Sequence, residues 1–292
     1  MPKSLLGAAL VFVMVARGAA VPIPASPSFG TPVPVTIEGY RGDAMEPFVS
    51  TDGKYLFFNN RNAPGTNTDL LFARRVNDTT FAYAGALTGA NSPALDAVAS
   101  IDKSEHFYFV STRSYSSTYA TIYRGTFANG KISKVSIVPG VSSATPGRVN
   151  FDATISADGN TLYFVDARFD DANQPITADL VIARKTPSGF ARVADSARIL
   201  AKVNTRDLEY GAAISSDGLT LYFTRAAAPL GSASPAIYVA TRPQRTSAFG
   251  PPRKLTTLTG FVEAPALSPD GRAIYFHERV GATFRIFRAA RR

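Results

Sequence analysis

Short apolar runs alternate with polar, turn-forming segments along most of this chain of 292 residues. A run such as 162–165 (Leu-Tyr-Phe-Val) is apolar at every position, which predicts a strand that is buried on both faces. Most of these runs follow an Asp-Gly pair. Because Asp-Gly supplies the φ > 0 positions that a tight turn needs, each pair and its flanking runs predict a β-hairpin.

One phrase, Ser-x-Asp-Gly followed by an apolar strand, recurs along the chain. A degenerate copy lacks the glycine and carries one extra residue. The serines of successive copies are 50, 56, 59 and 53 residues apart, which is typical of a structural repeat. The five copies are 50–58, 100–109, 156–164, 215–223 and 268–276.

Each repeat continues beyond its hairpin. A fourth strand follows the third in four repeats, for example 131–135 after Asn129-Gly130. Four antiparallel strands in about 50 residues are typical of a propeller blade. The sequence therefore predicts an all-β fold, a five-bladed β-propeller of four-stranded antiparallel blades. The predicted third strands are 70–73, 121–124, 180–183, 237–240 and 284–287.

The fifth repeat has no fourth strand of its own. Segment 34–38 precedes the first blade, and we expect it to close the ring by pairing with 284–287. Closure of this kind removes the exposed sheet edges at the seam. The blades are predicted near 44–90, 94–140, 150–201, 208–259 and 262–292.

The N-terminal region resembles an export signal. Lys3 precedes an apolar run at 5–16 that is too short to span a bilayer, and small residues at 18–20 allow cleavage. The sequence predicts a signal peptide at 1–20, an extended leader at 21–33 and the propeller at 34–292. We therefore expect a periplasmic or secreted protein with no transmembrane segment in the mature chain.

The repeat phrase, with its Ser-Pro-Asp-Gly form at 268–271, resembles the WD40-like repeat of TolB-type β-propellers. The resemblance covers roughly 35–292, and the additional N-terminal domain of TolB has no counterpart here. It implies the propeller fold. Members of the family serve in periplasmic assemblies, as propeller domains of peptidases and as sugar-degrading lyases, so the resemblance implies no single activity.

Composition excludes several classes of site. The chain has no cysteine, which excludes disulfides, thiolate metal sites and a cysteine nucleophile, and only two histidines, which excludes a His-rich zinc site. The net charge is +9, but the basic residues form no long run. Together with predicted export, this argues against nucleic-acid binding and leaves open an attraction to anionic envelope surfaces.

Charged residues flank the predicted hairpins in every repeat. An acid stands at the start of each first strand and an arginine follows each second strand, so the hairpin register predicts that each acid lies near its own arginine. Together they would form one rim of the central channel. The acids are Glu46, Asp96, Asp152, Glu209 and Glu263, and the arginines are Arg61, Arg113, Arg168, Arg225 and Arg279.

This pattern has several interpretations. In the first, the pairs are purely structural, and each ties a loop by a fork-shaped hydrogen bond. In the second, some of them, with His277, bind a ligand that carries carboxylate or sugar groups. A ring of acids can also hold a cation such as Ca²⁺, although no contiguous calcium loop is present. Arabinanase-type glycosidases resemble the chain in architecture only, and that resemblance implies Glu46, Asp96 and Asp152 as candidate catalytic carboxylates.

The sequence favours a binding module over an enzyme, with no cofactor and no metal. We expect a monomer that binds an envelope protein, a small polar or acidic ligand, or a glycan at the Arg/acid rim. The alternative is a glycoside hydrolase or lyase. We expect this rim to be the working face because its loops vary, whereas the Asp-Gly turns are short and alike. His106 is expected to face solvent.

Overall fold

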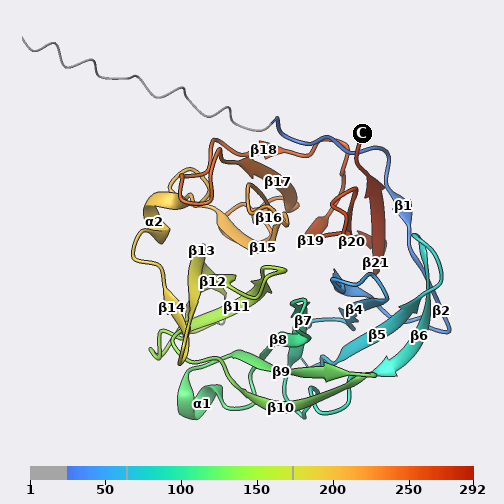
Figure 1. Cartoon of the computed structure of the whole chain (residues 1–292), viewed down its shortest axis with the longest axis horizontal. Coiled ribbons are helices and arrows are strands. Elements are labelled where there is room, and N and C mark those ends of the chain that lie inside the picture. The colour runs from blue at the N-terminus through green and yellow to red at the C-terminus, as the bar shows by residue number, and fades with distance from the viewer. Residues whose placement is uncertain (1–24, 64, 173) are drawn as a thin grey trace, which may run out of the picture.

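The structure is a computed structural model that describes residues 25–63, 65–172 and 174–292. It is built almost entirely of antiparallel four-stranded sheets arranged in a ring (Figure 1). The β-propeller predicted from the repeats is therefore confirmed. The predicted signal peptide at 1–20 lies outside the described residues.

The strand pairing gives five four-stranded units, which we call blades 1 to 5. Blade 1 comprises β3 (Met45–Val49), β4 (Tyr55–Asn59), β5 (Leu70–Arg75) and β6 (Thr80–Ala86). Blade 2 comprises β7 (Asp96–Ile101), β8 (His106–Ser111), β9 (Ile122–Ala128) and β10 (Lys131–Ile137). Blade 3 comprises β11 (Arg148–Ile155), β12 (Thr161–Phe169), β13 (Pro175–Thr186) and β14 (Gly189–Arg192).

Blade 4 comprises β15 (Leu208–Ile214), β16 (Thr220–Ala226), β17 (Ala236–Thr241) and β18 (Arg253–Lys254). Blade 5 comprises β19 (Val262–Leu267), β20 (Ala273–Val280), β21 (Thr283–Ala290) and, from the other end of the chain, β1 (Val33–Pro34). The sheets of blades 3 and 4 are joined by one parallel β-bridge, between Ala178 and Leu208. Two one-turn helices, α1 (Tyr115–Thr118) and α2 (Ser196–Ile199), lie in connections. The described residues contain no helix with the length and apolarity that crossing a membrane requires.

Each Ser-x-Asp-Gly phrase forms the turn between the first two strands of its blade. In blade 1, Ser50 Oγ donates to Asp52 Oδ1 at 2.7 Å, and Asp52 Oδ1 also accepts the N–H of Lys54 at 3.1 Å. Gly53 has φ +74°, as the turn requires. The same contacts recur at Ser156, Ser215 and Ser268. The turn prediction is confirmed, and the motif is a structural device.

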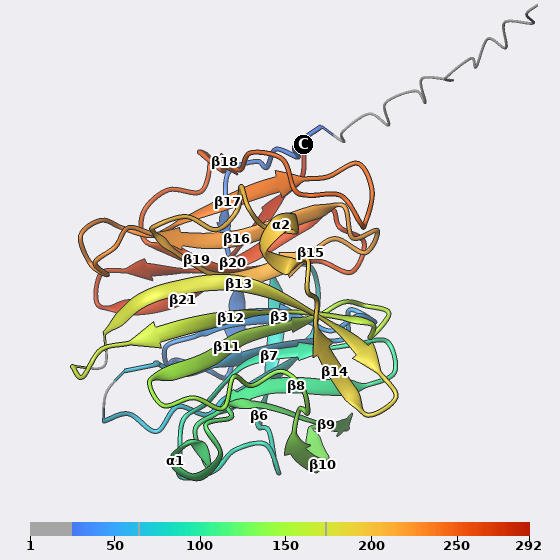
Figure 2. The same cartoon turned by 90° about the vertical axis from the view of Figure 1, so that its left-hand side faces the viewer.

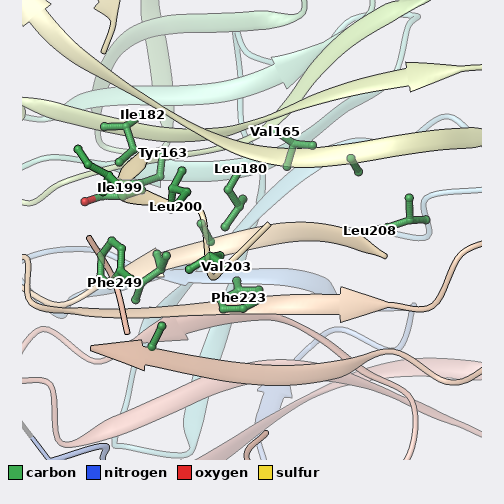
Figure 3. Close-up of a cluster of buried hydrophobic side chains, with 14 of the residues drawn as sticks. Tyr163, Val165, Leu180, Ile182, Ile199, Leu200, Val203, Leu208, Phe223 and Phe249 are labelled. Atoms are coloured by element: carbon green, nitrogen blue, oxygen red, sulfur yellow. The ribbon is translucent and has the colours of Figure 1, made fainter. Parts of the chain in front are cut away.

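Neighbouring blades pack face to face around the ring (Figure 2), and each of the five blade interfaces holds one apolar cluster. Figure 3 shows the cluster between blades 3 and 4. Alternate residues of one strand serve different interfaces: Phe57 packs against blade 2, whereas Leu56 and Phe58 pack against blade 5. Successive side chains of a strand point to opposite faces, so the second strands need apolar residues at every position.

The N-terminal segment closes the ring, but it is divided between two blades. Val33 pairs with Arg288 and Pro34 with Phe287 on β21, whereas β2 (Thr36–Glu38) runs parallel to β6 of blade 1. The prediction that 34–38 pairs with 284–287 is thus correct only at its start. The contact also begins earlier than predicted, because Phe29 is 1% exposed within the cluster between blades 4 and 5. The described part of the predicted leader is extended and packed.

Candidate functional site

The innermost strand of every blade contains a β-bulge at the same place. The register between first and second strands shifts there, and one residue adopts a left-handed conformation with φ between +50° and +58°. A bulge of this kind redirects side chains and is costly for residues other than glycine. Its recurrence around the channel defines five equivalent positions. These are Glu46, Val98, Asp152, Gly211 and Ala264.

Three of the predicted acids lie at or beside these bulges. Glu46 and Asp152 are bulge residues, and Glu263 immediately precedes the bulge residue of blade 5. Asp152 Oδ2 accepts the N–H of Gly211 at 2.8 Å. Glu263 Oε1 accepts the hydroxyl of Tyr210, and its Oε2 lies 3.0 Å from His277 Nε2. We call Glu46, Asp152 and Glu263 the channel carboxyls.

The channel carboxyls influence one another's ionisation. Burial, together with the charges of Asp152 and Glu263, raises the pKa of Glu46 well above its usual range. Burial also raises the pKa of Asp152 to about 7, and the charge of Glu263 acts in the same direction. Glu46 Oε2 is buried and has no hydrogen-bond partner among the described residues. The raised pKa values favour the protonated forms of Glu46 and Asp152, while Glu263 is hydrogen-bonded to Tyr210 and His277.

Two of the predicted acids are structural. Asp96 is fully buried and binds Arg113 Nη2 at 2.6 Å, and its other oxygen accepts the N–H of Ser92 at 2.5 Å. Glu209 is also fully buried and binds Arg225 Nε at 2.6 Å while accepting the N–H of Thr205 at 2.9 Å. Each acid lies two residues before the bulge of its strand. In blades 2 and 4 an acid and its arginine therefore hold the loop that leads into the first strand.

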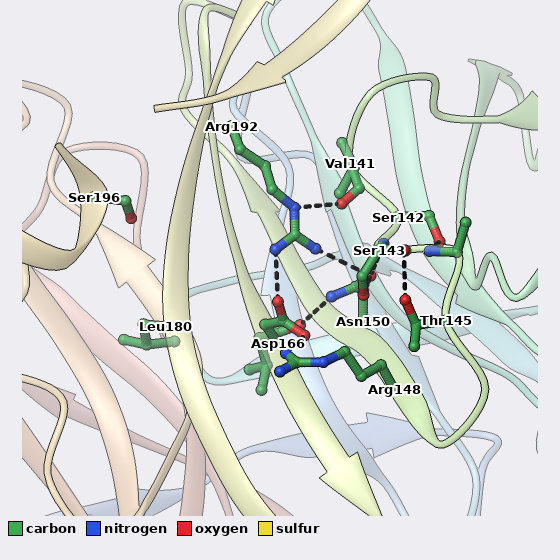
Figure 4. Close-up of polar contacts among 12 residues, drawn as sticks. Val141, Ser142, Ser143, Thr145, Arg148, Asn150, Asp166, Leu180, Arg192 and Ser196 are labelled. Atoms are coloured by element: carbon green, nitrogen blue, oxygen red, sulfur yellow. Dashed lines mark hydrogen bonds and ion pairs between the residues drawn. The ribbon is translucent and has the colours of Figure 1, made fainter. Parts of the chain in front are cut away.

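Blade 3 uses different residues for the same arrangement (Figure 4). Asn150 takes the place two residues before the bulge and accepts the N–H of Ser143 at 3.1 Å. Arg192, from the fourth strand, donates through Nη2 to Asn150 Oδ1 at 3.4 Å and through Nη1 to Asp166 Oδ2 at 2.5 Å. This substitution explains why Asp152 is released from structural pairing and lies in the channel.

The predicted pairing is wrong in the other three blades. Arg61 binds Asp43 Oδ2 at 2.5 Å and not Glu46. Arg168 is exposed and lies opposite Arg148 in the strand register, away from Asp152. Arg279 lies over the ring of Phe261, 4.5 Å from its centroid, while Glu263 contacts His277. The predicted ring of alternating acids and arginines therefore separates into structural pairs and channel carboxyls.

The two histidines have different environments. His277 is 1% exposed in the channel wall, and its Nδ1 accepts the N–H of Glu46 at 3.1 Å. His106 is partly exposed at the degenerate turn, where Nδ1 lies 2.9 Å from Asp102 Oδ2.

Tyr210 was not predicted as a site residue. Its position directly after Glu209 in a predicted innermost strand could have indicated it. In the part of the chain that the structure describes, no group of three or more His, Asp or Glu side chains is arranged to hold a metal ion.

Two pockets lie at the Asp-Gly turns. One, of about 510 Å³, is formed by turn residues of blade 1 and by 74–77. The other, of about 360 Å³, lies between the turns of blades 3 and 4 and is lined by Tyr163, Arg242 and Arg245 among others. The turns themselves are alike, as predicted, but the side chains beside them differ between the two pockets.

Comparisons with known proteins identify the fold. No protein-family model matches the sequence, and no curated protein is significantly similar to it. A solved structure described as a glycoside hydrolase has a TM-score of 0.59 at 11% identity, with 93% of this chain and 91% of that chain covered. A family 117 glycoside hydrolase produced by Zobellia galactanivorans has a TM-score of 0.55 at 12% identity, with 91% and 92% covered.

TolB from Acinetobacter baumannii has a TM-score of 0.47 at 14% identity, and 86% of this chain is covered. The chain spans 55% of that TolB's length. These identities are low, and the likeness of the two glycoside hydrolases shows the fold alone. The fold of this chain is that of an all-β propeller.

Proposed function

We propose that the chain is a binding protein for a small, uncharged ligand rich in hydroxyl groups, such as a sugar, at the channel carboxyls. One observation carries this proposal: three carboxyl groups from blades 1, 3 and 5 share the channel, and none of them is paired with an arginine of the described residues. Protonated carboxyls donate hydrogen bonds and a carboxylate accepts them, which suits hydroxyl groups because they do both.

The geometry disfavours the acidic ligand that the sequence left open for this rim. Three of the five predicted arginines are held in structural ion pairs. An anion in the channel would lie against carboxyl oxygens. Its negative charge would be repelled there by the ionised forms of these groups. The side chain of Glu263 is 13% exposed, which leaves part of it accessible to a ligand.

The second candidate function is glycoside hydrolysis by the same residues. One specific observation favours it: burial raises the pKa values of Glu46 and Asp152, as a general acid requires, and both share the channel with Glu263. The residues concerned would be Glu46, Asp152 and Glu263, because Asp96 is bound by Arg113.

We also infer that the chain is exported. The N-terminal sequence supports this inference, since a positive residue, a short apolar run and small residues follow one another at 3–20. Sequencing the N-terminus of the protein recovered from the periplasm or the medium tests it, and a protein that keeps Met1 contradicts it.

The ligand is best tested by titration calorimetry with neutral sugars and with uronic acids, on the wild type and on Glu263→Gln and Asp152→Asn. We expect saturable binding of a neutral sugar that falls about tenfold or more in Glu263→Gln. Asp158→Asn, at an exposed turn, is the control and should bind normally. Aryl glycosides assayed in parallel separate the two functions: turnover lost in Glu263→Gln supports hydrolysis. Absence of both binding and turnover in the folded wild type contradicts both.

A further inference from the structure

The pocket between the turns of blades 3 and 4 is distinct from the channel carboxyls. It lies where 156–163 of blade 3 faces 214–218 of blade 4, and its volume of about 360 Å³ is in the range of small-molecule sites. The longest side chains in its wall are cationic: Arg184, Arg242 and Arg245.

Arg242 is the unusual residue in this wall. It is only 4% exposed, its Nε donates to the carbonyl of Gly218 at 2.8 Å, and its Nη2 lies 3.1 Å from the hydroxyl of Tyr163. Its guanidinium also lies 4.3 Å from the ring centroid of Phe249. None of the ion pairs among the described residues includes Arg242, whereas buried arginines are normally paired with an acid.

In blade 1, the arginine at the equivalent position is paired with an acid. Arg75 ends the third strand of blade 1, and Arg242 directly follows the third strand of blade 4. Each donates its backbone N–H to the carbonyl of the residue after the turn glycine, Lys54 and Leu219 respectively. Arg75 has its own carboxylate partner, Asp78. The guanidinium of Arg242 instead faces a pocket whose acid, Asp158, is held by Arg245 at 3.3 Å.

The positive charge of the pocket is not balanced by the protein. Burial lowers the pKa of Arg242, the contact with Tyr163 raises it, and the positive charges of Arg184 and Arg245 lower it. Arg184 and Lys185 are exposed at the pocket and take part in no ion pair of the described residues. A bound anion would relieve this repulsion.

The other wall of the pocket is apolar. Ile182 and Ile199, which belong to the cluster in Figure 3, line it together with Val193 and Ile214. A ligand that fills this site therefore needs both a charged end and an apolar part. We infer that the pocket binds a small organic anion, whose carboxylate or phosphate group contacts Arg242 and Arg184 and whose apolar part packs on Ile182 and Ile199.

The inference is tested by titration calorimetry on the full chain with phenylacetate, phenyl phosphate and inorganic phosphate, at low and high ionic strength. Benzyl alcohol is the uncharged control ligand. We expect saturable binding of at least one organic anion, weakening as salt increases because the contact is electrostatic. Phenylacetate and phenyl phosphate distinguish a carboxylate from a phosphate site. Binding of inorganic phosphate as tightly as of the organic anions contradicts the apolar part of the inference.

Two variants separate binding from folding. Arg184→Gln changes an exposed side chain and should weaken binding about tenfold with unchanged melting. Arg242→Lys keeps the charge but removes the planar fork, and it should also weaken binding. Arg75→Gln, at the equivalent position of blade 1, is the matched control and should bind normally. The inference is overturned if the wild type binds no anion at low salt, if benzyl alcohol binds equally well, or if both Arg184→Gln and Arg242→Lys bind normally.

Discussion

His277 Nδ1 accepts the backbone N–H of Glu46 at 3.1 Å, and this contact connects the last blade to the first at the channel wall. Because Nδ1 accepts, the proton of the neutral ring must be on Nε2, which then donates to Glu263 Oε2 at 3.0 Å. A doubly protonated ring would lose the contact with Glu46. The same imidazole thus orients a channel carboxyl and holds the seam between blades 5 and 1.

The first prediction follows from this contact. His277→Ala should lower the free energy of unfolding by about 2–4 kcal/mol, because it removes two hydrogen bonds and leaves a cavity. Denaturant unfolding measures the change. His106→Ala is the control: its side chain is 43% exposed at a turn, so the loss should be below about 1 kcal/mol. Equal losses in the two variants would show that His277 has no special role at the seam.

The second prediction concerns pH. The folded-state pKa of Asp152, about 7, lies above its ordinary value of 3.8, so between these values the native state binds a proton that the unfolded state has released. The contribution of Asp152 to stability therefore falls as pH rises from about 4 to about 7. Asp152→Asn removes this effect and retains an acceptor for Gly211.

Urea unfolding at pH 5 and at pH 8 measures it. At pH 8 we expect Asp152→Asn to be more stable than the wild type by about 1–4 kcal/mol, the upper figure corresponding to the full shift. At pH 5 the gain should be smaller. A gain that does not depend on pH would mean that Asp152 is ionised throughout this range.

The third prediction compares two turn glycines. Gly159 and Gly271 have φ +71° and +68°, so alanine costs about 1–2 kcal/mol at either position. A Cβ on Gly271 meets nothing within 4 Å, but a Cβ on Gly159 would lie 2.5 Å from Asp102 Oδ2. Gly159→Ala should therefore lose more stability than Gly271→Ala, by about 1 kcal/mol or more, and Gly159→Val more still. Melting temperatures of the variants compare them directly, and equal losses would show that blade 2 moves freely away from the turn.

The fourth prediction separates structural arginines from the exposed one. Arg113→Gln should cost about 3–5 kcal/mol because it leaves the buried Asp96 without its charged partner. Arg225→Gln should behave likewise with Glu209. Arg168→Gln, at an exposed position, should change stability by no more than about 0.5 kcal/mol. A large loss in Arg168→Gln would indicate an ion pair with Asp152 after all.

Most of the fold could be predicted from the sequence because the repeat encodes it locally. Asp-Gly fixes the turn in four of the five blades. The second strands are apolar on both faces because each serves two interfaces. The candidate site was harder to predict because the bulges decide it. Glu209 and Asp152 were both predicted at the start of an innermost strand, yet Glu209 lies two residues before its bulge and Asp152 is the bulge residue. The spacing of the repeats does not reveal where a bulge lies within a strand. It also predicted Glu46 as the partner of Arg61, whereas Arg61 binds Asp43, which lies before the repeated acid position.

The divided N-terminal segment determines how the ring can assemble. Its partner β21 lies about 250 residues further along the chain, so a chain in which blades 1 to 4 have formed without blade 5 is an open arc. In that arc the apolar face of Leu56 and Phe58, which blade 5 later covers, is exposed to other molecules. A segment from a second copy has the same sequence and fits the same edge of β21. The seam is therefore the place where two crowded, partly folded chains would exchange strands and form a domain-swapped dimer.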